Sequence, residues 1–388
     1  MKKKIAILGS TGSIGKTLLN IIEKDKKNFE IILLTAHSNY KKLLKQAKKF
    51  KVKNLIISNK RTFEKIKEKN IKNIKIYNSF EDLNLIFNKK IDYVMSSIVG
   101  LDGLDPTIKI IKFTKKIAIA NKESIICGWN LIKKELNENK TEFIPVDSEH
   151  FSLWYGLKNS NNDDIEKIFI TASGGPFYKT SLNKFKSIKV SEATNHPNWK
   201  MGKKISIDSA TMINKVYEVI EARNIFDIPL NKIDILIHPK SYIHAIIKFQ
   251  NGLIKIIAHD TTMAIPIFNT LYSKPNLNLK FNRINVNKLN NLNLIKLNYK
   301  RYPIAKILNS LPENHSLYFT IIVSINDTLV DLFLKNKISF IEIQKIFLKM
   351  ANDKNFVKFK KINPYKIQDI INLNKYVRLK TLKKVYKS

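Results

Sequence analysis

The chain is 388 residues long, which exceeds the size of one ordinary hydrophobic core, so we expect two or three domains. Its formal charge of +37 is spread over the whole length without a zinc-finger, RNA-binding or basic-heptad pattern, which argues against a nucleic-acid partner and favours an anionic, phosphorylated substrate. A single cysteine excludes an intramolecular disulfide, and no apolar run approaches the roughly eighteen residues of a membrane helix, so we expect a cytoplasmic protein.

The first apolar run leads into a glycine-rich turn. Residues 5–8 have the pattern of a buried strand, G-S-T-G-S-I-G at 9–15 that of a turn, and 16–24 that of a helix. Strand, glycine-rich turn and helix in this order are typical of a loop whose backbone N–H groups bind a phosphate. The spacing G-x-x-G-x-x-G is a variant of the dinucleotide fingerprint, so we expect a nucleotide cofactor here.

A P-loop is the rival interpretation of this turn. G-K-T at 15–17 completes the P-loop motif except for its first glycine, whose place is taken by Ser10. A P-loop nucleotide hydrolase also needs an acidic residue after a later strand to hold Mg²⁺, and the apolar run 93–98 ends without one. Nucleotide hydrolysis is therefore kept as the less favoured alternative.

The strands that follow predict a doubly wound, mostly parallel sheet. The second strand, 31–36, ends without the Asp or Glu that binds the ribose of NAD, while Lys41 and Lys42 follow closely, which favours the 2′-phosphate of NADP. The polar triplet N-K-E at 121–123 follows a later strand, where such sheets place ligands, and a plain helix cap is the alternative. Further apolar runs alternate with Lys- and Glu-rich helical stretches, at 55–57, 74–77, 93–98 and 117–120.

Two carboxylates follow the apolar run I-P-V. If Val146 ends a strand, side chains alternate between the two faces of the strand, so Asp147 and Glu149 would project to the same face. Two like charges this close favour a bound cation, and oxygen ligands suit Mg²⁺ or Mn²⁺. A solvated acidic turn that caps a helix beginning near Phe151 is the alternative. A third carboxylate, Glu218, would complete a metal site.

Another α/β region with candidate substrate ligands follows. S-G-G-P at 173–176 comes after a strand at 168–172, and its glycines allow a close approach to an anion or form a plain tight turn. H-P-N-W-x-M-G at 196–202 places Trp199 in a loop, where it is either a packing anchor or part of a lid.

Two further motifs contain polar residues that we consider for the site. Asp208 or Ser209 is expected to cap a helix on which Asn214 and Glu218 share a face. The histidines at 238 and 244 follow a strand at 233–237, and each taken alone is more typical of a structural role than of catalysis.

The C-terminal part predicts a connector and a helical domain. From 275 to 300 the chain is rich in Asn, Leu and Lys and has no glycine, which indicates an extended connector. Periodic apolar segments at 327–334 and 338–350 then indicate helices.

Eight motifs occur along nearly the whole chain: G-S-T-G-S-I-G at 9–15, N-K-E-S at 121–124, V-D-S-E-H at 146–150, S-G-G-P-F at 173–177, H-P-N-W-x-M-G at 196–202, S-A-T-M-x-N-K-x-x-E at 209–218, I-E-A-R at 220–223 and I-H-P-x-S-x-I-H at 237–244. In type and order they resemble those of the 1-deoxy-D-xylulose 5-phosphate reductoisomerase family. The resemblance implies conversion of 1-deoxy-D-xylulose 5-phosphate to 2-C-methyl-D-erythritol 4-phosphate in non-mevalonate isoprenoid precursor biosynthesis. It also implies NADPH and a divalent metal, Mg²⁺ or Mn²⁺ with Co²⁺ as a third candidate, and a homodimer.

The resemblance further implies roles for individual residues. The metal ligands would be Asp147, Glu149 and Glu218. The substrate-binding residues would be Lys122, Ser148, Glu149, Ser173, His196, Ser209, Asn214, Lys215 and Glu218. The cofactor-binding residues would be Thr11, Gly12, Ser13, Ile14, Asn39, Asn121, Glu123 and Gly202. The catalytic group would comprise Lys122, Glu149, His196, Trp199, Lys215 and His244, with the role of His244 left open.

The expected fold is α/β. Residues 1–146 would form a Rossmann-like, doubly wound NADPH-binding domain, and 147–274 a central α/β domain for catalysis, metal and substrate, with a flexible lid near 195–203. Residues 275–300 would be the connector and 301–388 the C-terminal α-helical domain. No nucleic-acid or membrane partner is expected.

The chain departs from the family pattern at three places. Val216 and Tyr217 replace the usual Gly-Leu beside the substrate-binding lysine, and His37-Ser38 replaces a glycine and a basic residue near the cofactor. A P-D-M-R-x-P-I-like segment has become H-D-T-T-M-A-I-P-I at 259–267, which we expect to serve structure or the dimer contact. Another NADP-linked oxidoreductase of a phosphorylated sugar therefore stays the main alternative.

Overall fold

The computed structural model describes residues 1–386, apart from 70, 200, 273–283 and 291. Among these residues, no helix combines the length and the apolar character that a membrane crossing requires. The chain divides into two compact units. The first comprises Met1–Ser124, Leu131–Phe151 and Met263–Phe281, and the second comprises Ile125–Asn130, Ser152–Thr262 and Asn282–Ser388.

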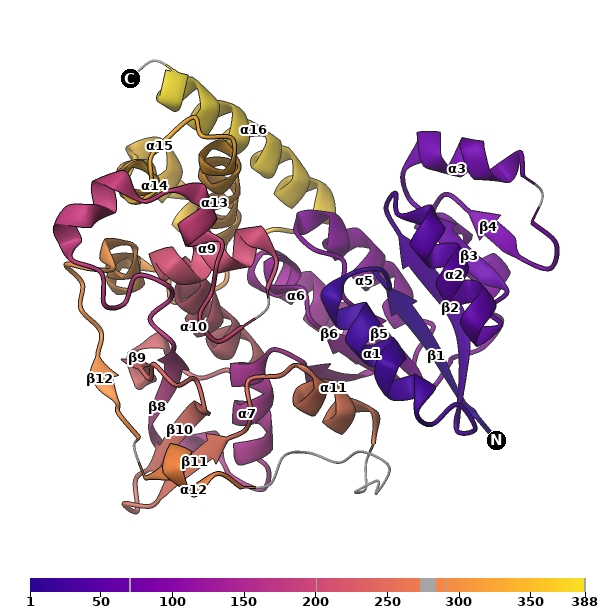
Figure 1. The fold of residues 1–388 in the computed structure, drawn as a ribbon, viewed down its shortest axis with the longest axis horizontal. Helices are drawn as coiled ribbons and strands as arrows, with labels where there is room; N and C mark the ends of the chain where they lie inside the picture. The colour runs from indigo at the N-terminus through magenta and orange to yellow at the C-terminus, as the bar shows by residue number, and fades with distance from the viewer. Residues whose placement is uncertain (70, 200, 273–283, 291, 387–388) are drawn as a thin grey trace. The chain divides into compact units, whose positions relative to one another are not determined.

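A parallel sheet of seven strands forms the centre of the first unit, in the order β4-β3-β2-β1-β5-β6-β7 (Figure 1). The strands are short apolar runs, and β1 is buried over most of its length, as is typical of a sheet covered on both faces. The sheet confirms the predicted doubly wound fold. Its strands are β1 Lys3–Leu8, β2 Phe29–Ala36, β3 Asn54–Ile57, β4 Lys75–Tyr77, β5 Tyr93–Ser96, β6 Lys116–Ile119 and β7 Glu142–Pro145.

The strand order reverses between β1 and β5, which are neighbours in the sheet. In open α/β sheets, ligands bind beyond the carboxyl ends of the strands at such a reversal. The glycine-rich turn 9–15 follows β1, and the N-K-E triplet at 121–123 follows β6. The fold of the first unit thus places both predicted cofactor motifs at the same edge of one sheet.

The helices of the first unit cover this sheet. Leu18 and Ile22 are buried on one face of α1, and Ile267 from a distant segment of the chain joins the same core. The hydroxyls of Tyr93 and Thr270 lie 2.7 Å apart, which ties α11 to β5. The helices are α1 Ser13–Glu23, α2 Tyr40–Phe50, α3 Lys60–Lys67, α4 Leu83–Ile86, α5 Leu104–Ile111 and α11 Ala264–Leu271, while α6 Lys122–Glu138 and α7 Ser148–Gly156 contain residues of both units.

The second unit contains a mixed sheet in the order β11-β10-β8-β9-β12. Strands β8 and β9 pair in parallel, and the remaining pairs are antiparallel. The sequence predicted β8 and β9, whereas β10, β11 and β12 were not recognised. The strands are β8 Ile165–Ala172, β9 Ile233–Ile237, β10 Ile243–Phe249, β11 Ile254–Ala258 and β12 Ile295–Lys296.

Helices form the rest of the second unit, and from residue 301 onward they are its regular structure, as predicted (Figure 1). The long helix α13 is buried on nearly all sides, because α14 and α16 pack against it. The helices are α8 Val190–Ala193, α9 Lys203–Thr211, α10 Ile213–Phe226, α12 Val286–Leu289, α13 Tyr318–Leu334, α14 Phe340–Ala351, α15 Lys354–Val357 and α16 Ile367–Tyr386.

Two local expectations differ from the structure. Asp208 and Ser209 lie inside α9 and cap no helix; α10 begins after Met212, whose φ of 70° is left-handed and ends the preceding helix. In the expected connector 275–300, residues 275–283 and 291 lie outside the described part of the chain. The described remainder contains α12 and β12, which pairs with β9, so it is not merely extended.

Candidate functional site

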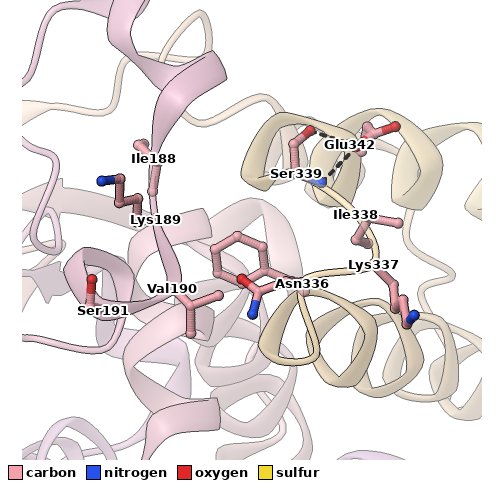
Figure 2. Close-up of a pocket in the computed structure, with 10 residues that line it drawn as sticks. Ile188, Lys189, Val190, Ser191, Asn336, Lys337, Ile338, Ser339 and Glu342 are labelled. Carbon is pink, nitrogen blue, oxygen red and sulfur yellow. Dashed lines mark hydrogen bonds between the residues drawn. The ribbon is translucent and has the colours of Figure 1, made fainter.

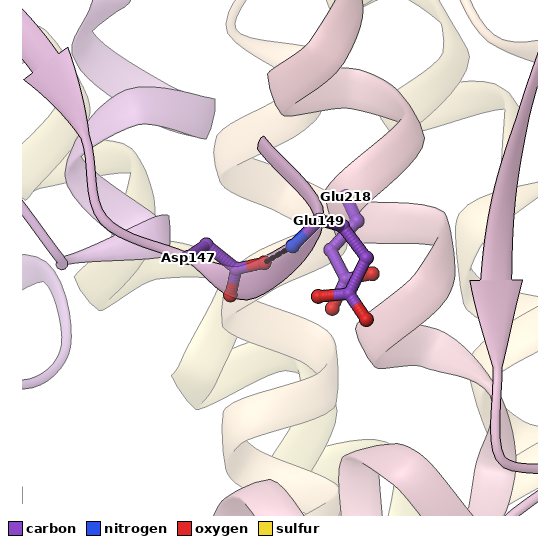
Figure 3. Close-up of side chains that lie close together, drawn as sticks. All are labelled: Asp147, Glu149 and Glu218. Atoms are coloured by element: carbon purple, nitrogen blue, oxygen red, sulfur yellow. Dashed lines mark hydrogen bonds between the residues drawn. The ribbon is translucent and has the colours of Figure 1, made fainter. Parts of the chain in front are cut away.

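Three carboxylates come together in the structure. Asp147 follows β7, Glu149 lies in the first turn of α7, and Glu218 lies on α10. One oxygen atom from each lies within 4.8 Å of the others (Figure 3). Glu149 and Glu218 are buried, and buried like charges repel each other unless a cation lies between them. A set of carboxylate oxygens therefore fits a hard divalent ion such as Mg²⁺ or Mn²⁺.

The start of a helix brings Asp147 and Glu149 together, and not the alternation of side chains along a strand. β7 ends at Pro145, and α7 begins at Ser148, earlier than the expected start near Phe151. The N–H of Glu149 donates to Oδ1 of Asp147 at 3.3 Å, as happens where a side chain accepts from the first turn of a helix. The local geometry behind the predicted pair was therefore wrong, and a strand-to-helix turn holds the two side chains.

Donors surround the carboxylates of this turn. The ammonium of Lys122, at the start of α6, forms an ion pair with Asp147. The hydroxyl of Ser148 donates to Oε2 of Glu149 at 2.6 Å. Both donors were predicted to bind substrate, and they lie where they also orient the two acids.

Glu218 has its own donors on α10. The side-chain amide of Asn214 donates to Oε1 of Glu218, and the ammonium of Lys215 forms an ion pair with Oε2. The structure thus confirms that Asn214 and Glu218, four residues apart, share a face of one helix. Lys215 and Glu218 are both buried, so each charge requires the other.

A histidine and a serine form a second polar pair in the second unit. Nδ1 of His196 accepts hydrogen bonds from the backbone N–H groups of Asn198 and Trp199, at 3.1 and 3.0 Å. The neutral ring then carries its hydrogen on Nε2, which lies 3.0 Å from Oγ of Ser173. Burial, together with the charge of Lys215, lowers the pKa of His196 to about 4, which keeps the ring neutral.

These contacts orient the Ser173 hydroxyl as a hydrogen-bond donor. Its Oγ accepts from Nε2 of His196 and from the backbone N–H of Gly175, which is 3.0 Å away. A hydroxyl that accepts twice has its one hydrogen left to donate. Gly174 and Gly175 both have positive φ, 86° and 68°, so this turn has the backbone that glycine permits most readily. The arrangement suits an anionic group such as a phosphate.

The remaining predicted substrate and lid residues lie in the same unit. Ser209 lies in α9, whose N-cap is Gly202. The rings of Trp199 and His244 meet edge-on with centroids 6.1 Å apart. The lid prediction covers residues 195–203, of which Lys200 lies outside the described residues.

The predicted cofactor residues of the first unit lie in one loop and at two helix starts. Gly12 caps α1 at the turn after β1. A Cβ on Gly15 would lie 2.5 Å from Cα of Ser10, so the turn depends on the absence of that atom. The adjoining predicted residues in this loop and the first turn of α1 are Thr11, Ser13 and Ile14.

Two asparagines and a glutamate complete this edge of the sheet. Asn39 caps α2, and its side chain accepts from the N–H of Lys42. Asn121 caps α6: its side chain accepts from the N–H of Ser124 and donates to the carbonyl of Gly100. Glu123, in the first turn of α6, is buried. The bond from Asn121 to Gly100 joins the loops after β5 and β6, while Asn39 holds the start of α2.

Lys16 belongs to the P-loop-like motif, and the sequence alone does not assign it to NADP. In the structure, a side-chain hydrogen bond with Lys16, followed by burial and by the repulsion between the two positive charges, lowers the pKa of Lys42 to about 8. The pair lies at the starts of α1 and α2, next to the predicted cofactor residues. The signal in the sequence was a lysine after the glycine turn and another after the second strand, but only the fold shows that they are neighbours.

A pocket of about 650 Å³ lies elsewhere in the second unit (Figure 2). It lies between the segment that enters α8 and the turn from α13 to α14. None of its lining residues belongs to the predicted site. They are Ile188, Lys189, Val190, Ser191, Phe333, Asn336, Lys337, Ile338, Ser339 and Glu342.

Three family models match successive parts of the chain. Residues 5–128 match the model for 1-deoxy-D-xylulose 5-phosphate reductoisomerase. Residues 143–226 match the model for the C-terminal domain of that enzyme, and 260–380 match a second model of a DXP reductoisomerase C-terminal domain. Together these matches cover well over half of the chain.

Named relatives resemble the chain over nearly its full length. The 1-deoxy-D-xylulose 5-phosphate reductoisomerase of Pelagibacter ubique is 58% identical over 382 residues, 97% of this chain and 98% of the relative. The enzyme of Clostridium kluyveri is 37% identical over 385 residues, with 97% and 98% covered.

Solved structures share the fold. The enzyme of Zymomonas mobilis in complex with NADPH has a TM-score of 0.88 at 30% identity, covering 99% of each chain. A DOX-P reductoisomerase in complex with NADPH, fosmidomycin and magnesium has a TM-score of 0.90 at 29% identity, covering 99% of this chain and 98% of that one.

Proposed function

Because the chain belongs to the 1-deoxy-D-xylulose 5-phosphate reductoisomerase family, we propose that it rearranges and reduces 1-deoxy-D-xylulose 5-phosphate to 2-C-methyl-D-erythritol 4-phosphate. NADPH is the reductant and a divalent metal is required, in the non-mevalonate route to isoprenoid precursors. The observation within the molecule that carries this function is the group of three carboxylates, Asp147, Glu149 and Glu218. A simple NADP-linked dehydrogenase would have no need for such a group.

We propose that these three carboxylates hold the metal. When bound, a divalent ion supplies a Lewis acid that polarises the carbonyl and hydroxyl oxygens of the substrate and stabilises negative charge on them. Lys122 and Ser148 orient two of the acids through the contacts described above. The Lys122 ammonium, with three donor hydrogens, can also donate to a substrate oxygen, whereas Ser148, whose hydrogen goes to Glu149, would accept from a substrate hydroxyl.

The phosphate of the substrate is assigned to the second unit. Ser173 has a hydrogen to donate, and Ser209, Asn214 and Lys215 supply further donors and a positive charge. Neutral His196 fixes the Ser173 hydroxyl and adds no charge of its own. We propose that Trp199 closes over the substrate and excludes water from the reactive intermediates.

NADPH is assigned to the carboxyl edge of the parallel sheet. The turn at 9–15 presents backbone N–H groups to the diphosphate, since glycines allow its close approach. Asn39, Asn121, Glu123 and Gly202 would contact the rest of the cofactor. Lys42, beside Lys16, is the residue that we assign to the 2′-phosphate, in place of the basic residue that the family has near Ser38.

We propose domain boundaries at 146, 274 and 300, as the sequence predicts, and a cytoplasmic location. The single cysteine, which is buried, supports a reducing compartment.

We further propose a homodimer. Strand β11 lies at an edge of its sheet, and the side chains of Leu253, Ile254 and Ile256 are 66%, 56% and 47% exposed. Exposed apolar edges are prone to pair with another chain. Ile254→Lys is expected to convert the dimer to monomer in light scattering, while Leu85→Lys, at an exposed position of the first unit, leaves it unchanged. A monomeric wild type would contradict the proposal.

The activity is tested by the loss of NADPH absorbance when purified protein is mixed with Mg²⁺ or Mn²⁺ and 1-deoxy-D-xylulose 5-phosphate. Oxidation that requires substrate, stops with EDTA and is lost in Asp147→Asn is the expected result. A folded, NADPH-binding protein that oxidises no cofactor with this substrate would contradict the proposal and favour another NADP-linked reaction.

A further inference from the structure

A stack of three rings joins the lid segment to the sheet of the second unit. The imidazoles of His244 and His259 lie face to face, with centroids 3.8 Å apart and 18° between their planes. The indole of Trp199 meets His244 edge-on at 6.1 Å and 71°. The edge-on contact has the geometry of an attractive aromatic pair, and the two imidazoles are in direct van der Waals contact over their faces. His259 thus lies one ring away from the tryptophan of the lid.

A bulge in β10 aims His244 at this stack. Ile243 pairs with Ala258 and Ala245 pairs with Ile257, so His244 is the extra residue between two regular pairs. A bulge bends its strand and changes the direction of a side chain. Nε2 of His244 lies 3.1 Å from the carbonyl oxygen of His259. Residue 259 therefore holds His244 both by its ring and by its backbone.

His259 is itself fixed from the other side. Its Nδ1 lies 2.8 Å from the carbonyl of Asp260, and the Asp260 carboxylate forms an ion pair of 2.9 Å with Lys288 on α12. The N–H of His259 donates to the carbonyl of Tyr242 at 2.9 Å. His259 and His244 are both buried, so neither ring can turn without displacing its neighbours.

The backbone of the lid is held separately. The side chain of Asn198 donates to the carbonyl of Pro239 at 2.6 Å and to Oγ of Ser241 at 2.9 Å. These bonds fix the loop but leave the direction of the Trp199 indole to its ring contacts. The ring that Trp199 meets is His244, and its position depends on His259.

We propose that His259 is a positioning residue for the reaction: by stacking on His244, it sets where Trp199 rests before the lid closes over the substrate. The kinetic part of this inference rests on the proposed function. It gives a role to a residue in the 259–267 segment, where this chain departs from the pattern of its family. If His259 merely filled space, any side chain of similar volume would replace it without an effect on turnover.

The test compares His259→Phe, which retains a flat ring, with His259→Leu, which fills similar volume without one. We expect His259→Leu to lower kcat/KM for 1-deoxy-D-xylulose 5-phosphate by about tenfold, since displacing a positioning group by a fraction of an ångström weakens catalysis. His259→Phe should retain kcat/KM within about twofold, because ring stacking is preserved. Equal kinetics in the two variants would overturn the proposal.

A fluorescence measurement reports on the lid without turnover. The emission of Trp199, taken as the difference from Trp199→Phe in each background, is expected to change in unliganded His259→Leu and to stay unchanged in His259→Phe. Unchanged emission in both variants would contradict the proposal. If His259→Leu fails to fold, His259→Gln, which is polar and lacks a flat ring, is measured in its place.

A control separates positioning from stability. Ile247→Ala removes a fully buried side chain from β10, the strand that contains His244. It should lower the melting temperature while leaving Trp199 emission and kcat/KM close to wild type. A loss of kcat/KM in Ile247→Ala as large as in His259→Leu would refute a specific role of the stack. Wild-type protein that oxidises no NADPH with this substrate would instead refute the proposed function. The Trp199 emission of the unliganded variants would still show whether His259 positions Trp199.

Discussion

The cofactor edge of the first unit and the polar cluster of the second unit are built by different means. At the cofactor edge, backbone geometry dominates: Gly9 has φ 80°, and a Cβ on Gly15 would collide with backbone. In the second unit, buried side chains hold each other, as Lys215 holds Glu218 and His196 holds Ser173. The first region is therefore sensitive to added atoms, and the second to lost charges and lost hydrogen bonds.

The largest effect is expected from removing a charge of the second unit. Glu218→Gln should lower NADPH oxidation by about a thousandfold or more, since it removes a metal ligand and leaves the buried Lys215 ammonium without its charged partner. Calorimetry with Mn²⁺ should show weakened binding. Glu221→Gln, a buried acid one turn further along α10, is the matched control and should retain turnover and Mn²⁺ affinity. Equal losses of turnover and Mn²⁺ affinity in the two variants would mean that neutralising any buried acid of α10 has this effect, and that Glu218 has no specific role.

An added methyl group tests the backbone of the first unit. Gly15→Ala should weaken NADPH binding by about ten- to a hundredfold, because its Cβ would lie 2.5 Å from Ser10 Cα and 2.7 Å from the Gly9 carbonyl oxygen. Gly12→Ala, whose Cβ would lie 3.3 Å from the same oxygen, should have a smaller effect. Fluorescence titration with NADPH compares the two. A larger loss in Gly12→Ala would show that the loop does not bind the cofactor in this conformation.

A charge reversal tests cofactor selectivity at the same edge. Lys42→Glu should weaken NADPH binding by about tenfold or more while leaving NADH binding nearly unchanged, because only NADPH has the 2′-phosphate. Lys45→Glu makes the same change on the exposed side of α2 and serves as the control. If both variants weaken the two cofactors equally, the general positive field, and not a specific contact, is responsible.

The smallest effect concerns the titration of His196. NMR should give a pKa of about 4 in the folded protein, below the ordinary value of 6.5, and Lys215→Met should raise it because a neighbouring positive charge is removed. The unfolded chain then binds more protons than the folded one once the pH falls below about 6.5, so stability decreases as the pH falls from there towards 4. His196→Gln should flatten this decrease in urea denaturation. A pKa near 6.5 would show that His196 is solvated.

Local patterns predicted much of the first unit. The strand after Lys3 and the turn at 9–15 were recognised because a buried parallel strand is a continuous apolar run and a phosphate-binding turn needs glycine at set positions. In the second unit, β10 and β11 were missed, and the cap expected at Asp208 was wrong because Met212 takes the left-handed conformation that ends α9. Methionine is rarely found in that conformation, so the sequence contains no residue that indicates the end of α9 at this position.

By itself, the sequence determined the doubly wound sheet and the helical C-terminal part, and its motifs, through their resemblance to the family, supplied the candidates for metal, substrate and cofactor. These features are local or depend on residue type, so they can be read from a short stretch. Tertiary structure alone decided that Lys42 lies beside Lys16, that Ser173 receives the hydrogen of His196, and that His259 stacks on His244. Each of these pairs joins residues that are distant along the chain, and only packing brings such residues into contact.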